Sequence, residues 1–376
     1  MKKFLAMLLA VAMLGGALAA CGGGETTSTP SGNTGTPAGN SETPTVETVD
    51  INVGYMPNYG GLWSLMTAKE KGFFEEEGLN VTMTQFEDGP TIIAAMENGS
   101  VNFGYIGQGA HKLCVQGNAT IIALSHISNG DALIGGPGIS TVEDLKGKVV
   151  AYSSGTSSED ILRNALTAHN MTMDDIQAMD MDAPSIVTAM MSGGVDACAT
   201  WSPNSLTILE GMEGTTKLAD NMTFSDTTVS LASWIATPKY LEENRDVTVR
   251  FVRALMKAMD YAADGNYEEV AQWCATQAAL DYDTMYNQRG DADWLTGKEV
   301  VDGVADGTVK GYYELQQKNL LDGGSITEED VSPVKDYVDF DLMTEPGNYK
   351  YAPRGGGGGI PPPPLSRVNR FFTKPE

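Results

Sequence analysis

Five of the six residues from Ser153 to Ser158 carry hydroxyl groups, and an apolar helical pattern follows them. A helix N-terminus offers unpaired N–H groups and a partial positive charge, so added hydroxyl donors can form a seat for an anion. The spacing of Thr156 and Glu159 also fits a capping box, so helix capping alone is the open alternative. The candidate ligand contacts in this turn are Ser154, Thr156 and Ser157.

Aromatic residues form a second group of candidates. Trp and Tyr rings suit flat or cationic ligands, but packing in the core explains Trp63 and Trp234 equally well. Asp131 lies beside a predicted crossing between two folded units, where its carboxylate could pair with an amine. The aromatic candidates are Tyr55, Tyr59, Trp63, Trp201 and Trp234.

Motifs for catalysis are missing from the sequence. It contains no G-x-S-x-G, no H-E-x-x-H and no Walker A pattern, and its three His and four Cys residues are scattered. The 376 residues carry a formal charge of −25, which argues against nucleic-acid binding because phosphate contacts need clustered Lys and Arg. We therefore predict that the protein is not an enzyme and that it has no metal or cofactor.

Alternating strand and helix patterns must position these candidates. Two successive β/α rhythms, followed by a mostly helical C-terminal part, predict an α/β fold with two lobes around a cleft, each lobe a mainly parallel sheet flanked by helices. The first rhythm has strands at 50–55, 79–86, 101–106 and 119–125, with helices at 62–72 and 91–97. The second has strands at 147–152, 195–199 and 231–237, with a helix at 161–168.

Residues 53–81 resemble the opening of the substrate-binding proteins of ABC importers, in the nitrate/sulfonate/taurine and thiamine-precursor family. The matching positions are Ala68, Gly72-Phe73-Phe74, Gly78-Leu79 and Val81. Three further motifs follow in the family's order, at 98–104, 142–148 and 193–203. Asn102 and Ser202 stand where the family more often has acids. The resemblance covers roughly residues 50–345.

The resemblance implies a type II periplasmic-binding-protein-like fold. We expect a first lobe at 49–134 plus 235–350 and a second lobe at 135–234. The family's ligand loops correspond to 55–59, 107–109, 153–157 and 201–204, which adds Asn58, Gln108 and Asn204 to the candidate ligand contacts. These loops hold no Lys or Arg. A neutral, zwitterionic or N-heterocyclic solute is therefore favoured over bare nitrate.

The implied function is capture of a small organic solute, either sulfonate- or taurine-like or an N-heterocyclic thiamine precursor. The protein would be a monomer that delivers this solute to an ABC permease served by a separate ATPase. Two alternatives stay open at this point: an enzyme related to the thiamine-pyrimidine synthases, whose Cys cluster is absent here, and a surface adhesin.

The N-terminus reads as an export signal. Residues 1–21 combine a basic start, an apolar run and the ending Leu18-Ala19-Ala20-Cys21, which resembles a lipobox. Cys21 would then be lipidated, and this lipid would be the only membrane contact, on the outer face of a bacterial cell membrane. Residues 22–48 are rich in Gly, Pro, Ser and Thr and should form a disordered tether. Residues 351–376 form a disordered Gly/Pro tail with no assigned function.

Overall fold

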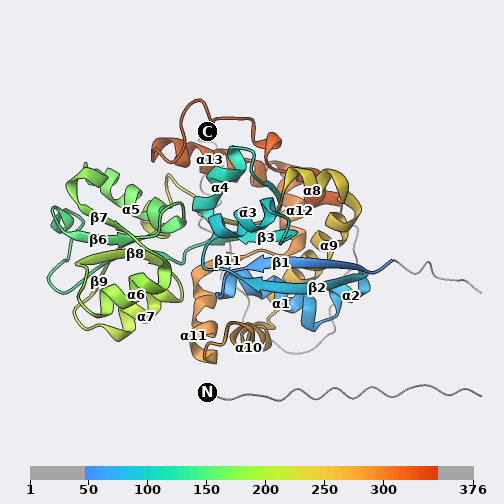
Figure 1. Cartoon of the computed structure of the whole chain (residues 1–376), viewed down its shortest axis with the longest axis horizontal. Helices are drawn as coiled ribbons and strands as arrows, with labels where there is room; N and C mark the ends of the chain where they lie inside the picture. The colour runs from blue at the N-terminus through green and yellow to red at the C-terminus, as the bar shows by residue number, and fades with distance from the viewer. Residues whose placement is uncertain (1–46, 346–376) are drawn as a thin grey trace, which may run out of the picture. The chain divides into compact units, whose positions relative to one another are not determined.

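The computed structural model describes residues 47–345, and within them eleven strands form two separate sheets (Figure 1). The predicted signal, the lipidated Cys21, nearly all of the tether and the C-terminal tail lie outside the described residues. The first sheet has the order β11 (Ala292–Trp294), β4 (Thr120–Ser128), β10 (Leu231–Ala236), β3 (Phe103–Ile106), β1 (Val49–Tyr55) and β2 (Leu79–Gln85). The second has the order β7 (Gln177–Asp180), β6 (Val149–Tyr152), β8 (Ala197–Trp201), β5 (Asp131–Gly135) and β9 (Thr216–Asp220).

Helices surround both sheets. The helices of the N-terminal half are α1 (Tyr59–Glu70), α2 (Phe73–Glu76), α3 (Gly89–Glu97), α4 (His111–Val115), α5 (Ser157–Ala168) and α6 (Ala183–Met191). Those that follow are α7 (Asn204–Gly211), α8 (Pro238–Glu243), α9 (Arg245–Ala263), α10 (Tyr267–Ala278), α11 (Tyr282–Asn287), α12 (Gly297–Asp306), α13 (Thr308–Asp322) and α14 (Phe340–Thr344). Short 3₁₀ helices span Gln108–Ala110, Glu143–Leu145, Met173–Asp175, Asn221–Phe224, Gln288–Asp291 and Val334–Asp336.

Both sheets are mixed rather than mainly parallel. β1 runs parallel to β2 and β3, whereas β10 is antiparallel to both of its neighbours, β3 and β4. β5 is likewise antiparallel to β8 and β9. The βαβ patterns predicted the parallel pairs correctly, because a crossover helix returns the chain to the same end of the sheet. β5 and β10 are the strands by which the chain enters the other sheet, and each is antiparallel to both of its neighbours.

The second sheet is covered on both faces, and its strands alternate accordingly. Leu133, Val150 and Ala199 pack in the cluster that contains Leu162 of α5. Their neighbours Ile134, Ala151 and Cys198 pack with Ile186 of α6 and Ile208 of α7 in a separate cluster. Figure 1 shows α5 on one side of this sheet and α6 and α7 on the other. Because successive side chains of a strand point to opposite faces, each strand contributes to both clusters.

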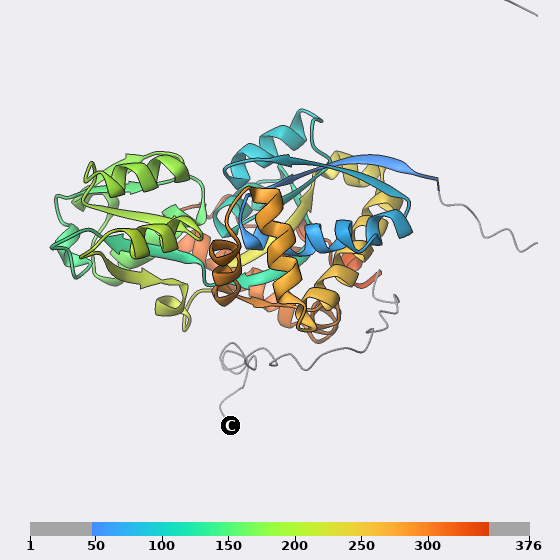
Figure 2. The same ribbon diagram turned by 90° about the horizontal axis from the view of Figure 1, so that it is seen from below.

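Helix α9 anchors the C-terminal part to the first sheet. Phe251 stacks on Phe103 of β3 at a ring-centroid distance of 4.1 Å and on Phe74 at 5.7 Å. Elements far apart in the sequence thus share one core, as the blue N-terminal and orange C-terminal ribbons of Figure 2 show. The three cysteines of the described segment, Cys114, Cys198 and Cys274, are buried free thiols.

The chain passes between the two sheets after β4 and again before β10. β5 begins at Asp131 and belongs to the second sheet, although the predicted boundary assigned residues up to 134 to the first lobe. β10 begins at Leu231 and belongs to the first sheet, a few residues before the predicted return at 235. The α/β fold class, the two-sheet arrangement and the mostly helical C-terminal part are confirmed. None of the helices between residues 47 and 345 combines the length and apolar composition that crossing a bilayer requires.

Candidate functional site: a pocket between the two sheets

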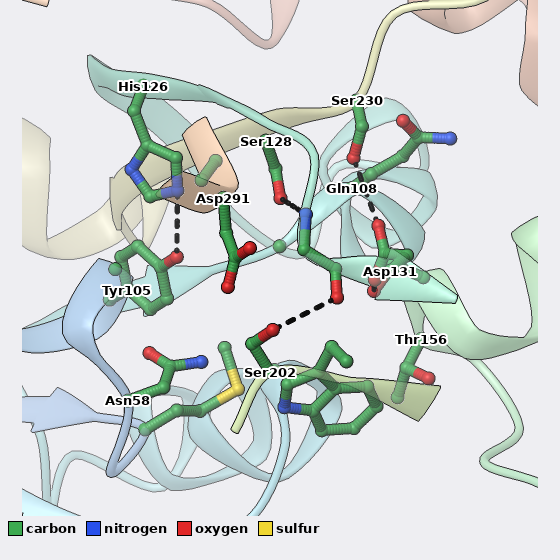
Figure 3. A pocket seen from close by; sticks show the side chains of 18 of the residues that line it. Asn58, Tyr105, Gln108, His126, Ser128, Asp131, Thr156, Ser202, Ser230 and Asp291 are labelled. Atoms are coloured by element: carbon green, nitrogen blue, oxygen red, sulfur yellow. Dashed lines mark hydrogen bonds between the residues drawn. The ribbon is translucent and has the colours of Figure 1, made fainter. Parts of the chain in front are cut away.

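A pocket of roughly 660 Å³, counting its open mouth, is lined by residues from both sheets (Figure 3). Several lining residues follow the carboxyl ends of strands: Asn58 after β1, Gln108 after β3, Thr156 after β6 and Ser202 after β8. The antiparallel β5 starts at the same edge, which adds Asp131. The carboxyl ends of strands are where α/β sheets leave room for ligands, so the topology brings these side chains together.

Asp131 is a buried carboxylate held by hydroxyl and amide donors. It is 3% exposed, and its Oδ1 accepts a hydrogen bond of 2.5 Å from the Ser157 hydroxyl. Its Oδ2 accepts bonds from Asn221 Nδ2 at 2.9 Å and from the Ser230 hydroxyl at 3.4 Å. Burial raises the pKa of Asp131 above its ordinary value, and the three hydrogen bonds offset part of that rise. Asp131 thus couples a strand of the second sheet to the start of α5 and to the return segment before β10.

Asp291 is the second carboxylate of the pocket and comes from the C-terminal part of the chain. It ends the 3₁₀ helix Gln288–Asp291, and its backbone carbonyl accepts a bond of 2.6 Å from the N–H of Asn129 in the first crossing segment. Burial raises the pKa of Asp291 to about 6; a Ser202 hydrogen bond and the charge of Lys217 lower it, and Asp131 raises it further. Its Oδ2 is buried and has no hydrogen-bond partner in the described segment.

Neutral aromatic groups form one wall of the pocket. His126 of β4 lies 3.5 Å from the Tyr105 hydroxyl through Nε2 and 3.1 Å from the Ser125 hydroxyl through Nδ1. Burial lowers the pKa of His126 to about 3, so this imidazole is uncharged at neutral pH. The ring of Trp294 packs against it at 4.6 Å between centroids, and the indole N–H of Trp294 donates to the Arg289 carbonyl, 2.7 Å away.

Gln108 places an amide in the same pocket with one atom unsatisfied. The side chain is 5% exposed and donates from Nε2 to Asp160 Oδ2 at 3.4 Å. That donation fixes which end of the amide is the oxygen, because an oxygen facing a carboxylate would be repelled. Oε1 is buried without a partner among the described residues. A buried acceptor left unpaired costs free energy, so a ligand donor at this point would be stabilising.

The hydroxyl-rich turn serves mainly to cap α5. Thr156 accepts a bond from the N–H of Ser158 and donates to the Ser153 carbonyl, while the Ser158 hydroxyl donates to the carbonyl of Ala199. Carboxylates already occupy two further N–H groups. Glu159 accepts from Gly155, and Asp180 accepts from Ser154. These contacts favour capping over the anion seat, because an incoming anion would meet acidic side chains there.

The same turn lies directly against the first-sheet side of the molecule. A Cβ built on Gly109 would approach the carbonyl carbon of Thr156 to 2.1 Å, so the two backbones touch at this point. Nearby, Lys112 of α4 faces Glu159 at 3.8 Å, and Ser325 donates to Asp160 at 3.1 Å. The start of α5 therefore contacts residues before and after it in the sequence, all from the side of the first sheet.

The predicted site residues separate into two groups. Six line the pocket: Asn58, Gln108, Asp131, Thr156, Ser157 and Trp201. Asn204 lines a neighbouring hollow together with Trp201 and Asn58, and Ser154 is exposed outside both. The other four are buried in the core behind the pocket: Tyr55, Tyr59, Trp63 and Trp234. For Trp63 and Trp234 the structure agrees with the core-packing alternative.

Several lining residues lie outside the predicted set. Tyr105 and His126 lie on strands β3 and β4. Both strands are apolar runs, and an apolar run does not indicate that one of its ends faces a pocket. Asp291 and Trp294 come from the C-terminal part of the chain, in which the sequence offered no candidate ligand contact. Ser202 stands where the family more often has an acid, and among these unpredicted lining residues it was the only one that the sequence marked as unusual. Among residues 47–345, Asp131 and Asp291 are the acids that line the pocket, and no Lys or Arg lines it.

Known proteins resemble this chain over most of its described length. The NMT1/THI5-like family profile matches residues 62–268. A Brucella abortus protein named as a binding protein is 31% identical over 298 residues, which cover 79% of this chain and 92% of that one. A Bacillus subtilis protein named as an aliphatic-sulfonates-binding protein is 28% identical over 283 residues, covering 70% and 77%. The crystal structure of the Escherichia coli periplasmic aliphatic sulphonate binding protein shares the fold, with a TM-score of 0.59, 19% identity and coverage of 78% and 98%. The resemblance seen in the sequence is thereby confirmed, and the chain belongs to the NMT1/THI5-like family.

Proposed function

We propose that this protein is the solute-binding component of an ABC importer and captures a small organic molecule between two lobes. The observation that carries the proposal is the pocket, since both sheets contribute polar and aromatic side chains to it. The names of the relatives, which are binding proteins, support binding rather than catalysis. The ligand contacts we propose are the six predicted residues that line the pocket, together with Ser202, Asp291 and Trp294.

The two lobes are proposed from the sheet assignments. One would comprise residues 47–129 and 230–345, and the other residues 131–220 with the connection that follows them. A ligand that touches both lobes favours the closed arrangement by no more than the difference in its affinity for the closed and open states. Closure would then present a surface to a permease, with a separate ATPase supplying the energy.

The binding step is tested with the purified chain after unfolding and refolding, which removes any solute carried through purification. Small organic solutes are screened by thermal shift, and Trp fluorescence reports on Trp201 and Trp294 in the pocket wall. A solute at 100 times its dissociation constant adds about 2.7 kcal/mol to the free energy of unfolding. If no solute of any charge class moves either signal, the proposed function is wrong.

Attachment to the outer face of the membrane through Cys21 is a separate proposal, supported by the lipobox-like ending. Cys21→Ser should move the protein from the membrane fraction to the soluble fraction of the producing bacterium, and mass spectrometry of the unaltered N-terminus should find acyl chains. An unmodified Cys21 in a cleaved or uncleaved chain would contradict this proposal and leave the binding proposal standing.

A further inference from the structure

The pocket is acidic, and its charge is not balanced from within. Asp131 and Asp291 both line it. Burial raises the pKa of each carboxyl, and the charge of Asp131 raises the pKa of Asp291 further. Figure 3 shows both carboxylates at the same space, with Asp291 pointing toward its middle. Lys217 is the cation whose charge reaches Asp291, but its ammonium is 2.8 Å from Asp220 and its side chain is 48% exposed.

Unpaired atoms in the pocket are acceptors. Oδ2 of Asp291 and Oε1 of Gln108 are buried and have no hydrogen-bond partner among residues 47–345. Asp131 uses three donors on its two oxygens, although a carboxylate has about four acceptor positions. A sulfonate or nitrate offers only further acceptors, so it would leave these atoms unpaired and place an anion beside two carboxylates. A ligand with N–H donors would satisfy them.

The remaining walls suit an organic cation. Trp201 and Trp294 present indole surface to the pocket, and aromatic faces attract ammonium and amidinium groups. His126 is neutral and therefore does not oppose a positive charge. The nearby guanidinium of Arg289 does not line the pocket and lies over the Tyr286 ring at 4.4 Å.

We infer that the pocket binds a small organic cation carrying N–H donors, such as a protonated amine or an amidine, with Asp291 and Asp131 as its counter-charges. This inference rests on the proposed solute-binding function and names the substrate class of the same pocket. It assigns to this chain a ligand charge opposite to that of the sulfonates in the names of some relatives. The chemical class of the ligand is inferred from the hydrogen-bond acceptors on the pocket wall and not from the family to which the chain belongs.

Pairs of probes with the same carbon skeleton and opposite charge test the inference directly. The refolded protein is titrated calorimetrically at pH 7.5 with benzylamine against phenylmethanesulfonate, and with butylamine against butanesulfonate. The two members of each pair share a carbon skeleton and differ in charge. We expect the amine of each pair to bind and the sulfonate to show no heat and no thermal shift.

Variants locate the binding. Asp291→Asn keeps the shape of the side chain and should weaken amine binding about tenfold or more, the size typical of a lost charge-assisted hydrogen bond. Asp131→Asn is a second variant that tests the inference if Asp291→Asn alters folding. The thermal midpoint of each unliganded variant shows whether its folding is altered. Asp302→Asn is the matched control, because Asp302 is an exposed residue of α12 and its substitution changes the net charge equally. It should change affinity less than about twofold, since exposed charges are screened.

The outcomes separate the two proposals. Tighter binding of the sulfonate in either pair overturns the cation inference and leaves solute binding intact. Equal weakening by Asp291→Asn and Asp302→Asn also overturns it, because attraction would then come from the net charge of −25 rather than from the pocket. No binding by any amine or sulfonate counts against both proposals.

Discussion

A methyl group at Gly109 should hold the two lobes apart. The Cβ of Gly109→Ala would lie 2.1 Å from the carbonyl carbon of Thr156, 2.4 Å from its oxygen and 2.6 Å from the N of Ser157. Ordinary contact begins at 3.4 Å, so the backbones must separate by about 1.3 Å. Both neighbours are backbone atoms and cannot turn aside as a side chain would. Overpacking of this kind typically costs ~1–3 kcal/mol.

That cost falls on the arrangement in which the lobes touch. If ligand binding requires this contact, a cost of ~1–3 kcal/mol weakens affinity by roughly 5- to 150-fold. If the unliganded protein opens as proposed, it avoids this cost, and its thermal midpoint should change little. Calorimetry with the tightest ligand measures the affinity, and small-angle scattering with and without ligand measures whether the variant still compacts.

A second glycine supplies the control. Gly290→Ala adds the same methyl group where no atom lies within 4 Å, and its backbone is not in the left-handed region. It should leave affinity and compaction at their original values. Unchanged affinity in Gly109→Ala, or a fall in its thermal midpoint with normal ligand affinity, would refute the argument that this contact belongs to the ligand-holding arrangement.

Three further predictions concern charge, packing and the pocket wall. Burial raises the folded-state pKa of Asp291 to about 6, so its contribution to the free energy of unfolding is fully present below about pH 4 and is lost as pH rises through 6. Amine binding has the opposite sign: affinity for benzylamine should fall as pH is lowered from 7.5 to 5, and Asp291→Asn should flatten the profile measured by calorimetry. Phe251→Ala should lower the free energy of unfolding by ~3–5 kcal/mol in a urea titration, because a fully buried ring stacked in the core is lost. A loss below 1 kcal/mol would contradict the packing described for α9. Trp201→Ala should weaken ligand binding with little change in thermal midpoint, because this ring is partly exposed and lines the pocket; unchanged calorimetric affinity would remove Trp201 from the site.

Most of the fold could be predicted from the sequence, because the patterns that mark each strand and helix are local. The alternation of Asp50 to Tyr55 and the spacing of Ile161, Leu162 and Ala165 each mark one element, and both elements are present. The direction of β10 was not readable. Strand direction in a sheet depends on where the chain re-enters, and that depends on packing between elements far apart in sequence.

The sequence predicted the site residues that lie in loops directly after strands, and it did not predict those that lie elsewhere. Gln108 and Trp201 come directly after or at the end of apolar runs, a place where α/β proteins bind ligands. Trp63 and Tyr59 belong to the buried face of α1, and the 100° spacing of a helix cannot say which aromatic rings face the pocket and which the core. Asp291 reaches the pocket from 160 residues beyond Asp131, so its role depends on tertiary structure alone.

The most direct test of the account is a crystal structure of the refolded protein with the tightest-binding amine. We predict electron density for the amine in the pocket, its nitrogen within hydrogen-bond distance of Asp291 on one side and its body against Trp201 from the other sheet. Density that touches residues of one sheet alone, or an amine bound outside this pocket, would contradict the claim that the two halves of the chain share one ligand.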